Sequence, residues 1–128
     1  MVGTNLNLLV LKASDPAALA KFYSRFGLRF ALEQHGRGPE HQACVMDNSV
    51  LEIYHLLDEG EKSIDVRLGF QVPSIDVATA GLDPVSNFLL PPSGTKWGRR
   101  CVIRDPQGHI VELVKRTLVE VSSSRQPS

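Results

Sequence analysis

The 128-residue sequence predicts an α+β fold built from two copies of one module, each a strand, a helix and then several strands. Two internal similarities support this prediction. Residues 50–54 (VLEIY) match residues 110–114 (IVELV) at an offset of 60, with a glutamate at the centre of each. Residues 8–11 align with residues 67–70 at an offset of 59, and a helix start follows each segment. Such spaced self-similarity indicates a duplicated unit, and two modules too small to bury a sheet face alone are expected to pair around a cavity.

The second copy ends in a predicted β-hairpin over residues 101–114. Its turn begins at Asp105, which can cap its own backbone, and Pro106 has its φ already set for a type I turn. In the strand that follows, Glu112 lies on an otherwise apolar face, because side chains alternate with a period of two. A carboxylate there is costly unless it is paired, coordinated or directed into a wet cavity. Glu52 repeats this anomaly in the first copy.

In the first module, a buried strand is predicted over residues 5–13, followed by a helix that Asp15 caps and Pro16 begins. The helix carries one apolar stripe and ends at Gly27. The stripe consists of Leu19, Phe22, Tyr23 and Phe26. Three strands are predicted to complete the module, over residues 28–32, 41–46 and 49–56, with a polar loop over residues 33–40.

The second module is predicted to follow a charged linker over residues 57–65. The expected elements are a strand over 67–72, a short helix over 74–80 that ends at Gly81, a strand over 87–90, a turn over 91–94 and the final hairpin. We therefore expect a single domain over residues 1–121, made of repeats 5–56 and 66–116, and a disordered polar tail over residues 122–128.

Composition narrows the class of partner. The 14 basic and 14 acidic side chains balance, which gives no support for a nucleic-acid or anionic-membrane partner. No apolar run approaches the roughly 20 residues that span a bilayer, and the N-terminus lacks the basic region of a signal peptide. We therefore expect a cytoplasmic protein. Cys44 and Cys101 have no metal-type spacing, so we expect two buried thiols in corresponding strands.

The repeat, the helix with its Asp15-Pro16 start and its aromatic stripe, and the ending Asp105-Pro106-x-Gly108 before Glu112 resemble the vicinal oxygen chelate superfamily. This superfamily includes glyoxalase I, extradiol dioxygenases and bleomycin resistance proteins. The resemblance covers roughly residues 5–116 and implies two βαβββ modules that pair into a cupped mixed sheet around a pocket. It also implies a homodimer. It leaves the chemistry open, because the superfamily supports several reactions on one scaffold.

The resemblance also implies four metal-ligand positions, one in the first and one in the last strand of each module. The first-strand positions, usually histidine, correspond to Leu8 and Arg67, and the last-strand positions to Glu52 and Glu112. The chain therefore keeps two carboxylates and lacks both imidazoles. Zinc, nickel or iron needs three or four nitrogen, oxygen or sulfur donors, and an arginine repels a cation. We therefore expect no metal and no cofactor, with a divalent metal held by the two glutamates as the alternative.

A substitute histidine would support that alternative. His55 and His109 lie three residues from their glutamates and are expected on the opposite strand face. His35 and His41 lie in or beside a loop, so either can in principle turn inward.

In the absence of a metal, we expect the Arg67 guanidinium to pair with the carboxylate of Glu112 or Glu52. Phe88 and Trp97 bracket a loop containing proline and glycine that is placed to cover the pocket, although packing is an alternative role for both. The predicted pocket lining is Leu8, Glu52, Tyr54, Arg67, Trp97 and Glu112.

Two functions remain open. The missing imidazoles favour a metal-independent protein that binds a small molecule, a drug or metabolite, without converting it. The alternative is a metal-dependent lyase, isomerase or dioxygenase in which Glu112 and Glu52 act as ligands or as a general base. A purely structural interaction module has no positive support. The sequence does not identify the ligand.

Overall fold

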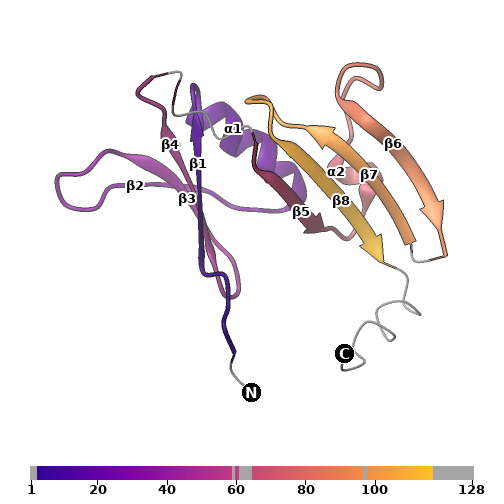
Figure 1. Ribbon diagram of the computed structural model, residues 1–128, viewed down its shortest axis with the longest axis horizontal. Coiled ribbons are helices and arrows are strands. Elements are labelled where there is room, and N and C mark those ends of the chain that lie inside the picture. The colour runs from indigo at the N-terminus through magenta and orange to yellow at the C-terminus, as the bar shows by residue number, and fades with distance from the viewer. Residues whose placement is uncertain (1–2, 59, 61–64, 97, 117–128) are drawn as a thin grey trace. The chain divides into compact units, whose positions relative to one another are not determined.

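The computed structural model describes residues 3–58, 60, 65–96 and 98–116 (Figure 1). The chain forms two compact units, unit 1 over Met1–Ser63 and unit 2 over Ile64–Ser128. Their boundary falls inside the predicted linker. Each unit contains one four-stranded mixed sheet with few helices, which confirms the α+β class. The predicted tail and Trp97 lie outside the described residues.

Unit 1 has the predicted order of strand, helix and three strands. Its strands pair in the order β1-β4-β3-β2, with β1 parallel to β4 and the other pairs antiparallel. The elements are β1 (Leu8–Ala13), α1 (Pro16–Tyr23), a 3-10 turn η1 (Ser24–Phe26), β2 (Ala31–Glu33), β3 (His41–Val45) and β4 (Val50–His55).

Helix α1 begins where the sequence predicts but ends at Tyr23, and the 3-10 turn η1 continues the helical segment to the predicted stop at Gly27. The Asp15 carboxylate accepts a hydrogen bond from the Ala18 N–H at 3.0 Å, and Gly27 has a φ of 88°, a left-handed conformation that glycine adopts without a Cβ penalty. The apolar stripe of the helix packs on β1, β3 and β4. The resulting core contains Leu11, Leu19, Phe22, Tyr23, Leu51 and Ile53.

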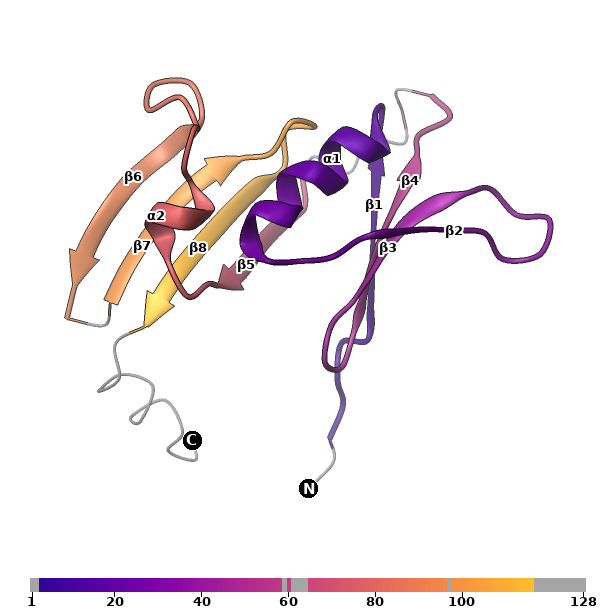
Figure 2. The ribbon, with the colours of Figure 1, turned by 180° about the vertical axis from the view of Figure 1, so that it is seen from behind.

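Unit 2 repeats this arrangement, with strand order β5-β8-β7-β6 and β5 parallel to β8. Its elements are β5 (Arg67–Gln71), α2 (Ile75–Ala78), β6 (Phe88–Thr95), β7 (Gly98–Arg104) and β8 (Ile110–Arg116). The short helix α2 lies on β7 and β8 (Figure 2). The Ser74 hydroxyl caps this helix by accepting from the Val77 N–H at 3.1 Å.

Several predicted element boundaries are wrong. The first strand begins at Leu8 and not at residue 5, and α2 covers only Ile75–Ala78. The turn predicted over residues 91–94 is part of β6, and the loop expected between Phe88 and Trp97 is therefore a strand as far as residue 95. β6 is an edge strand whose register with β7 shifts twice, and both edges and bulges tolerate proline. In unit 1, β2 begins three residues later than the predicted strand.

The strand register shows how the two units correspond. Val10 pairs with Glu52 in unit 1, and Gly69 pairs with Glu112 in unit 2, which preserves the predicted offsets. Cys44 and Cys101 lie in the corresponding strands β3 and β7, as predicted, but their positions differ by two residues in register. Cys44 pairs with the residue before its glutamate, whereas Cys101 pairs with the residue after. Both cysteines are buried free thiols, as predicted.

Each sheet buries one face under its own helix. In β4 and β8, the residues on either side of each glutamate are fully buried on the helix side. The glutamates themselves point to the opposite face. No helix in the described part of the chain has the length and apolar content that a membrane crossing needs.

Candidate functional site

Both glutamates lie on the sheet face away from the helix, where their carboxylates are partly shielded from solvent. The Glu52 side chain is 13% exposed and the Glu112 side chain 30% exposed. Each carboxylate has nitrogen-bearing neighbours within its own unit. Those neighbours differ chemically between the two units, histidines in unit 1 and arginines in unit 2.

In unit 1, Glu52 belongs to a cluster of four side chains with metal-ligand atoms, Glu33, His35, His41 and Glu52, called here the unit-1 cluster. The register places Glu33 at the end of β2 opposite His41 at the start of β3. The His41 Nε2 lies 3.3 Å from Glu33 Oε1 and 3.4 Å from Glu52 Oε2. His35, from the β2–β3 loop, places its Nε2 3.3 Å from Glu33 Oε1 and 3.9 Å from Glu52 Oε2.

His41 is the centre of this cluster. It is only 2% exposed, and its ring stacks between Tyr54, at a centroid distance of 4.3 Å, and His35, at 5.0 Å. Its Nδ1 lies 3.2 Å from the Pro39 carbonyl oxygen. A carbonyl only accepts, so Nδ1 carries a proton and donates. Its buried Nε2 has no hydrogen-bond partner among the described residues.

The negative charge of the cluster affects the pKa of Tyr54. Burial, followed by the charge of Glu52 and a hydrogen bond to it, raises the pKa of the Tyr54 hydroxyl above its ordinary value of 10.0. The Lys12 Nζ lies 5.7 Å from the centroid of the Tyr54 ring. Tyr54 and Lys12 therefore form the rim of the cluster on the β1 side.

In unit 2, Glu112 is paired with arginine. The Arg100 Nε donates to Glu112 Oε2 at 2.8 Å, and Arg100 Nη2 lies 2.6 Å from the same oxygen. The predicted partner, Arg67, lies farther away, with its Nη2 3.9 Å from Glu112 Oε1. Sequence reasoning missed Arg100. Counting back from the Asp105 turn would have found it, because the hairpin register places Arg100 opposite Val114 on the face of Glu112.

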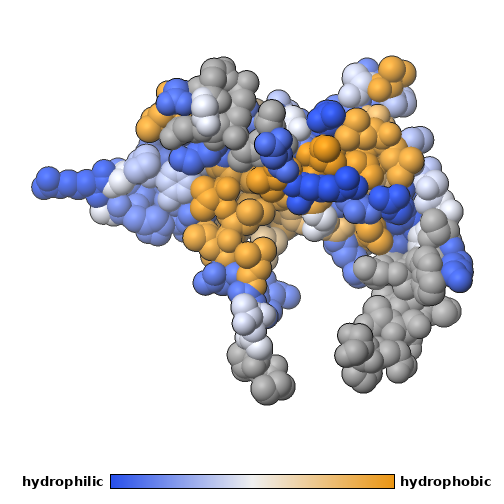
Figure 3. Space-filling model, in the orientation of Figure 1, coloured by the Kyte–Doolittle hydropathy of each residue, from blue (hydrophilic) through white to orange (hydrophobic). Residues whose placement is uncertain are grey.

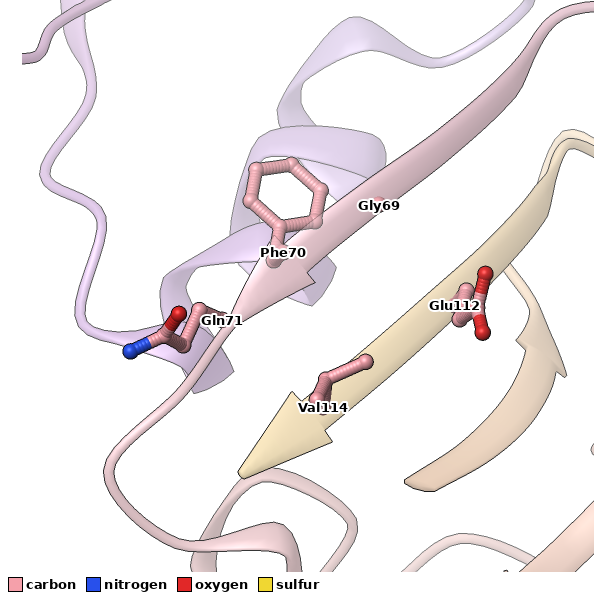
Figure 4. Close-up of a pocket in the computed structure, with 5 residues that line it drawn as sticks. All are labelled: Gly69, Phe70, Gln71, Glu112 and Val114. Atoms are coloured by element: carbon pink, nitrogen blue, oxygen red, sulfur yellow. The ribbon is translucent and has the colours of Figure 1, made fainter. Parts of the chain in front are cut away.

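A pocket of about 320 Å³ lies beside Glu112 on β5 and β8. It is lined by Gly69, Phe70, Gln71, Glu112 and Val114, and Figure 4 shows Glu112 and Val114 in a row along β8 next to β5. Gly69 contributes to the hollow directly. It pairs with Glu112, and a Cβ at this position would meet no atom within 4 Å. The missing side chain therefore leaves space beside the carboxylate.

The strand registers align the two sites position by position. His41 lies diagonally across from Glu52, as Arg100 does from Glu112. Glu33 pairs with His41, and at the corresponding position Ser93 pairs with Arg100. The same backbone positions therefore hold an acid and an imidazole in unit 1 but a hydroxyl and a guanidinium in unit 2.

The remaining predicted site residues lie apart from these groups. Leu8 is exposed and pairs with Val50, two residues along β1 from the partner of Glu52. His109 is buried and its Nδ1 lies 2.7 Å from Asp105 Oδ2, away from Glu112. His55 Nδ1 lies 2.6 Å from the Leu56 carbonyl oxygen. Of the four histidines, only the two loop-side ones approach a glutamate in the described structure.

No protein-family model and no curated protein sequence matches this chain. Solved structures do match it. TnmS3, an antibiotic binding protein from Streptomyces sp. CB03234, has a TM-score of 0.67 at 20% identity, over 91% of this chain and 99% of its own. A glyoxalase/bleomycin resistance protein from the same organism has a TM-score of 0.63 at 20% identity, over 87% and 100%.

A third solved structure, the oxidase ChaP-H2, matches with a TM-score of 0.64 at 16% identity, over 91% of this chain and 96% of its own. The three neighbours span a binding protein, a resistance-type protein and an enzyme, and their low identity to this chain restricts the comparison to backbone architecture. The duplicated strand–helix–strand units and these neighbours together show that the chain has the glyoxalase/bleomycin resistance fold of the vicinal oxygen chelate proteins.

Proposed function

We propose that the protein binds a small organic molecule, a drug or a metabolite, in the pocket of unit 2 and does not convert it. The observation that carries this proposal is the hollow that Gly69 leaves beside Glu112 and its arginine partner. Its volume of about 320 Å³ is at the lower end of the range of ligand pockets, about 300–1,000 Å³. TnmS3, which shares the fold, is an antibiotic binding protein.

The charges around the pocket indicate which ligand it would hold. Two guanidinium groups, of Arg100 and Arg67, lie near the single carboxylate of Glu112, so this face has an excess of positive charge and of hydrogen-bond donors. Val114 supplies apolar surface, and the missing side chain of Gly69 leaves room for a flat group beside it. A ligand with a flat apolar body and an anionic or acceptor group, such as a phenolate or carboxylate, matches this lining.

The same arginines support binding without a metal in unit 2. Arg100 places two nitrogens against one oxygen of Glu112, and Arg67 approaches the other. A cation that approached this carboxylate would meet two permanent positive charges.

Filling the pocket tests the proposal. A panel of aromatic antibiotics and phenolic metabolites is screened by thermal shift against the full chain, and hits are measured by calorimetry. Gly69→Val should abolish binding of the hits, because the new side chain occupies the hollow while a β-branched residue suits a strand. Gly94→Val is the matched control, since Gly94 also lies in a strand of unit 2 with open space around its Cβ, and it does not line the pocket.

The two variants distinguish binding in this pocket from binding elsewhere. Binding that disappears in Gly69→Val and persists in Gly94→Val supports the pocket. Equal binding in both variants would show that the ligand sits elsewhere, and a panel without hits would count against a binding protein for this class of molecule.

We further propose that the protein acts as a homodimer in the cytoplasm. Apolar side chains gather over β1 and its neighbours in unit 1 (Figure 3), and Leu8, Val10 and Val45 among them are exposed. An exposed apolar patch of this kind is typical of a surface that a partner covers. Light scattering of the purified chain tests the stoichiometry, and Val45→Lys should shift a dimer toward monomer.

A metal-dependent lyase, isomerase or dioxygenase remains the second candidate function, because four metal-ligand atoms of the unit-1 cluster lie within 4.8 Å of one another. A metal there supplies Lewis-acid or redox chemistry when bound. Metal analysis of the purified protein, together with turnover of the hemithioacetal of methylglyoxal and glutathione, tests this candidate.

A further inference from the structure

We propose that the unit-1 cluster of Glu33, His35, His41 and Glu52 binds one divalent first-row transition-metal ion with the preferences of Zn²⁺. The site is built from residues of unit 1 alone and shares none of them with the proposed organic-ligand pocket. It also differs from the ligand set that the family resemblance implies. Only Glu52 belongs to both sets, because Leu8 has no donor atom and Arg67 carries a permanent positive charge.

The spacing of the donor atoms fits such an ion. Four ligands held at about 2.0–2.1 Å in a tetrahedron stand about 3.3 Å from one another. Three of the nitrogen–oxygen distances in the cluster are 3.3, 3.3 and 3.4 Å, and the fourth, from His35 to Glu52, is 3.9 Å. Two imidazoles and two carboxylates suit zinc, and the two negative charges balance the ion.

The unsatisfied nitrogen of His41 is the independent observation that points to an ion. Since Nδ1 donates to the Pro39 carbonyl, the neutral ring presents the lone pair of Nε2 to two carboxylates. Three acceptors then face one another, and the buried Nε2 has no donor among the described residues. A cation between them removes this conflict, and the Nδ1–H···O=C bond is the outer contact that usually orients a metal-bound histidine.

The backbone positions all four ligands in advance. Glu33, His41 and Glu52 come from three neighbouring strands on one sheet face. His35 comes from the connecting loop, where the Gly38 N–H donates to the His35 carbonyl at 3.0 Å and closes the turn. The His35 side chain is 70% exposed, so it is the ligand that exchanges most readily with water or with an added molecule.

The alternative occupant is a proton. Protonation of Nε2 would make His41 an imidazolium between two carboxylates, and the 3.3 and 3.4 Å distances also suit ion pairs. The two occupants differ in a measurable way, because a metal displaces the proton from Nε2 whereas an imidazolium retains it.

The test uses the tag-free full chain, stripped with EDTA and dialysed. Zn²⁺ is titrated by calorimetry, the bound metal is counted by elemental analysis, and Co²⁺ serves as an absorbing substitute for Zn²⁺. Glu33→Gln and His35→Ala change exposed or half-exposed groups and should leave the fold intact. His41→Gln removes the central ligand. His55→Ala and Glu40→Gln are matched controls, since they remove a histidine and a glutamate outside the cluster.

We expect one Zn²⁺ per chain. His41→Gln and Glu33→Gln should each lower the affinity for Zn²⁺ at least about 100-fold, since loss of a residue that only orients a ligand already costs about 10- to 100-fold in affinity. His35→Ala should weaken it about tenfold or more, and the controls should match the wild type.

Three results would overturn the proposal. These are less than one tightly bound Zn²⁺ per chain, unchanged affinity in both Glu33→Gln and His35→Ala, and ¹⁵N spectra in which His41 Nε2 stays protonated at saturating Zn²⁺. Because Glu33→Gln and His35→Ala do not alter a buried residue, misfolding of His41→Gln alone leaves the test decisive.

Discussion

Replacing Asp105 by alanine should destabilise the protein, because this side chain accepts four hydrogen bonds at a turn. Asp105 is buried at the turn between β7 and β8. Its Oδ1 accepts hydrogen bonds from the N–H groups of residues 107, 108 and 109 at 2.9, 2.9 and 3.0 Å. Its Oδ2 accepts from the Nδ1 of His109 at 2.7 Å, and His109 is fully buried.

The magnitude follows from the donors that are left without an acceptor. The Gly108 N–H retains the backbone oxygen of residue 105 at 3.0 Å, and residue 107 is near solvent. The N–H and Nδ1–H of His109 are buried, and each buried donor left unsatisfied costs about 1–3 kcal/mol. Asp105→Ala should therefore lose about 2–6 kcal/mol, a large part of the roughly 5–15 kcal/mol that keeps a domain folded.

Urea denaturation followed by far-ultraviolet circular dichroism measures this loss, read as a lower midpoint at constant slope. Asp105→Asn is the control. It retains the oxygen that serves the three backbone donors, and His109 can change tautomer to accept from the new amide, so we expect at most about half the loss. A loss under about 1 kcal/mol in Asp105→Ala would refute the reasoning, as would an asparagine variant no more stable than the alanine variant.

Three further predictions concern other parts of the chain. Gly27→Ala should cost about 1–2 kcal/mol in the same assay, because alanine is strained at a φ of 88°. Glu52→Gln should move the ultraviolet titration of the Tyr54 phenol to lower pH, since the charge and hydrogen bond of Glu52 are among the causes that raise the pKa of this phenol. Because the pKa of Tyr54 is higher in the folded than in the unfolded protein, its contribution to stability is complete below about pH 10 and is lost as the pH rises further. Cys44 and Cys101 should react with a thiol reagent only on unfolding, because burial raises the pKa of both thiols; rapid reaction in native buffer would contradict this.

The fold could be predicted because its signals are local and repeated. A cap at Asp15 and a left-handed glycine at Gly27 mark the ends of the helical segment formed by α1 and η1, and the offset between the two glutamate-bearing strands marks the duplication. The region over residues 88–95 could not, because proline and glycine usually mark turns. Only the edge position of β6 and its irregular register make this sequence a strand.

The candidate site was harder to predict because it depends on pairing between strands. Sequence spacing identified Glu52 and Glu112 and left His35 and His41 as possible neighbours of Glu52, but it did not find Arg100 beside Glu112. His41 and Arg100 become their neighbours only through the antiparallel register of β3 with β4 and of β7 with β8. The expectation that the chain holds no metal depended on Leu8 and Arg67, which have no metal-ligand atoms. His35 and His41 instead approach Glu52 from the β2–β3 loop and from β3.

The duplication explains how one protein can carry two different sites on equivalent positions. Each unit presents a glutamate from its last strand to a nitrogen from the preceding strand, His41 in unit 1 and Arg100 in unit 2. An arginine neutralises its carboxylate permanently and has further N–H donors that can bind a ligand. A neutral histidine instead places a second acceptor beside the carboxylate, and a cation can bind to both. The same strand geometry thus favours an organic ligand in one unit and a metal ion in the other.

Exchanging these roles should require a change at the nitrogen-bearing position and not at the glutamate. The double variant Arg100→His with Ser93→Glu, which supplies the second acid, should give unit 2 a measurable affinity for Zn²⁺. Failure of this double variant to bind Zn²⁺, in a chain whose unit-1 cluster does bind it, would show that the loop histidine is as necessary as the strand positions.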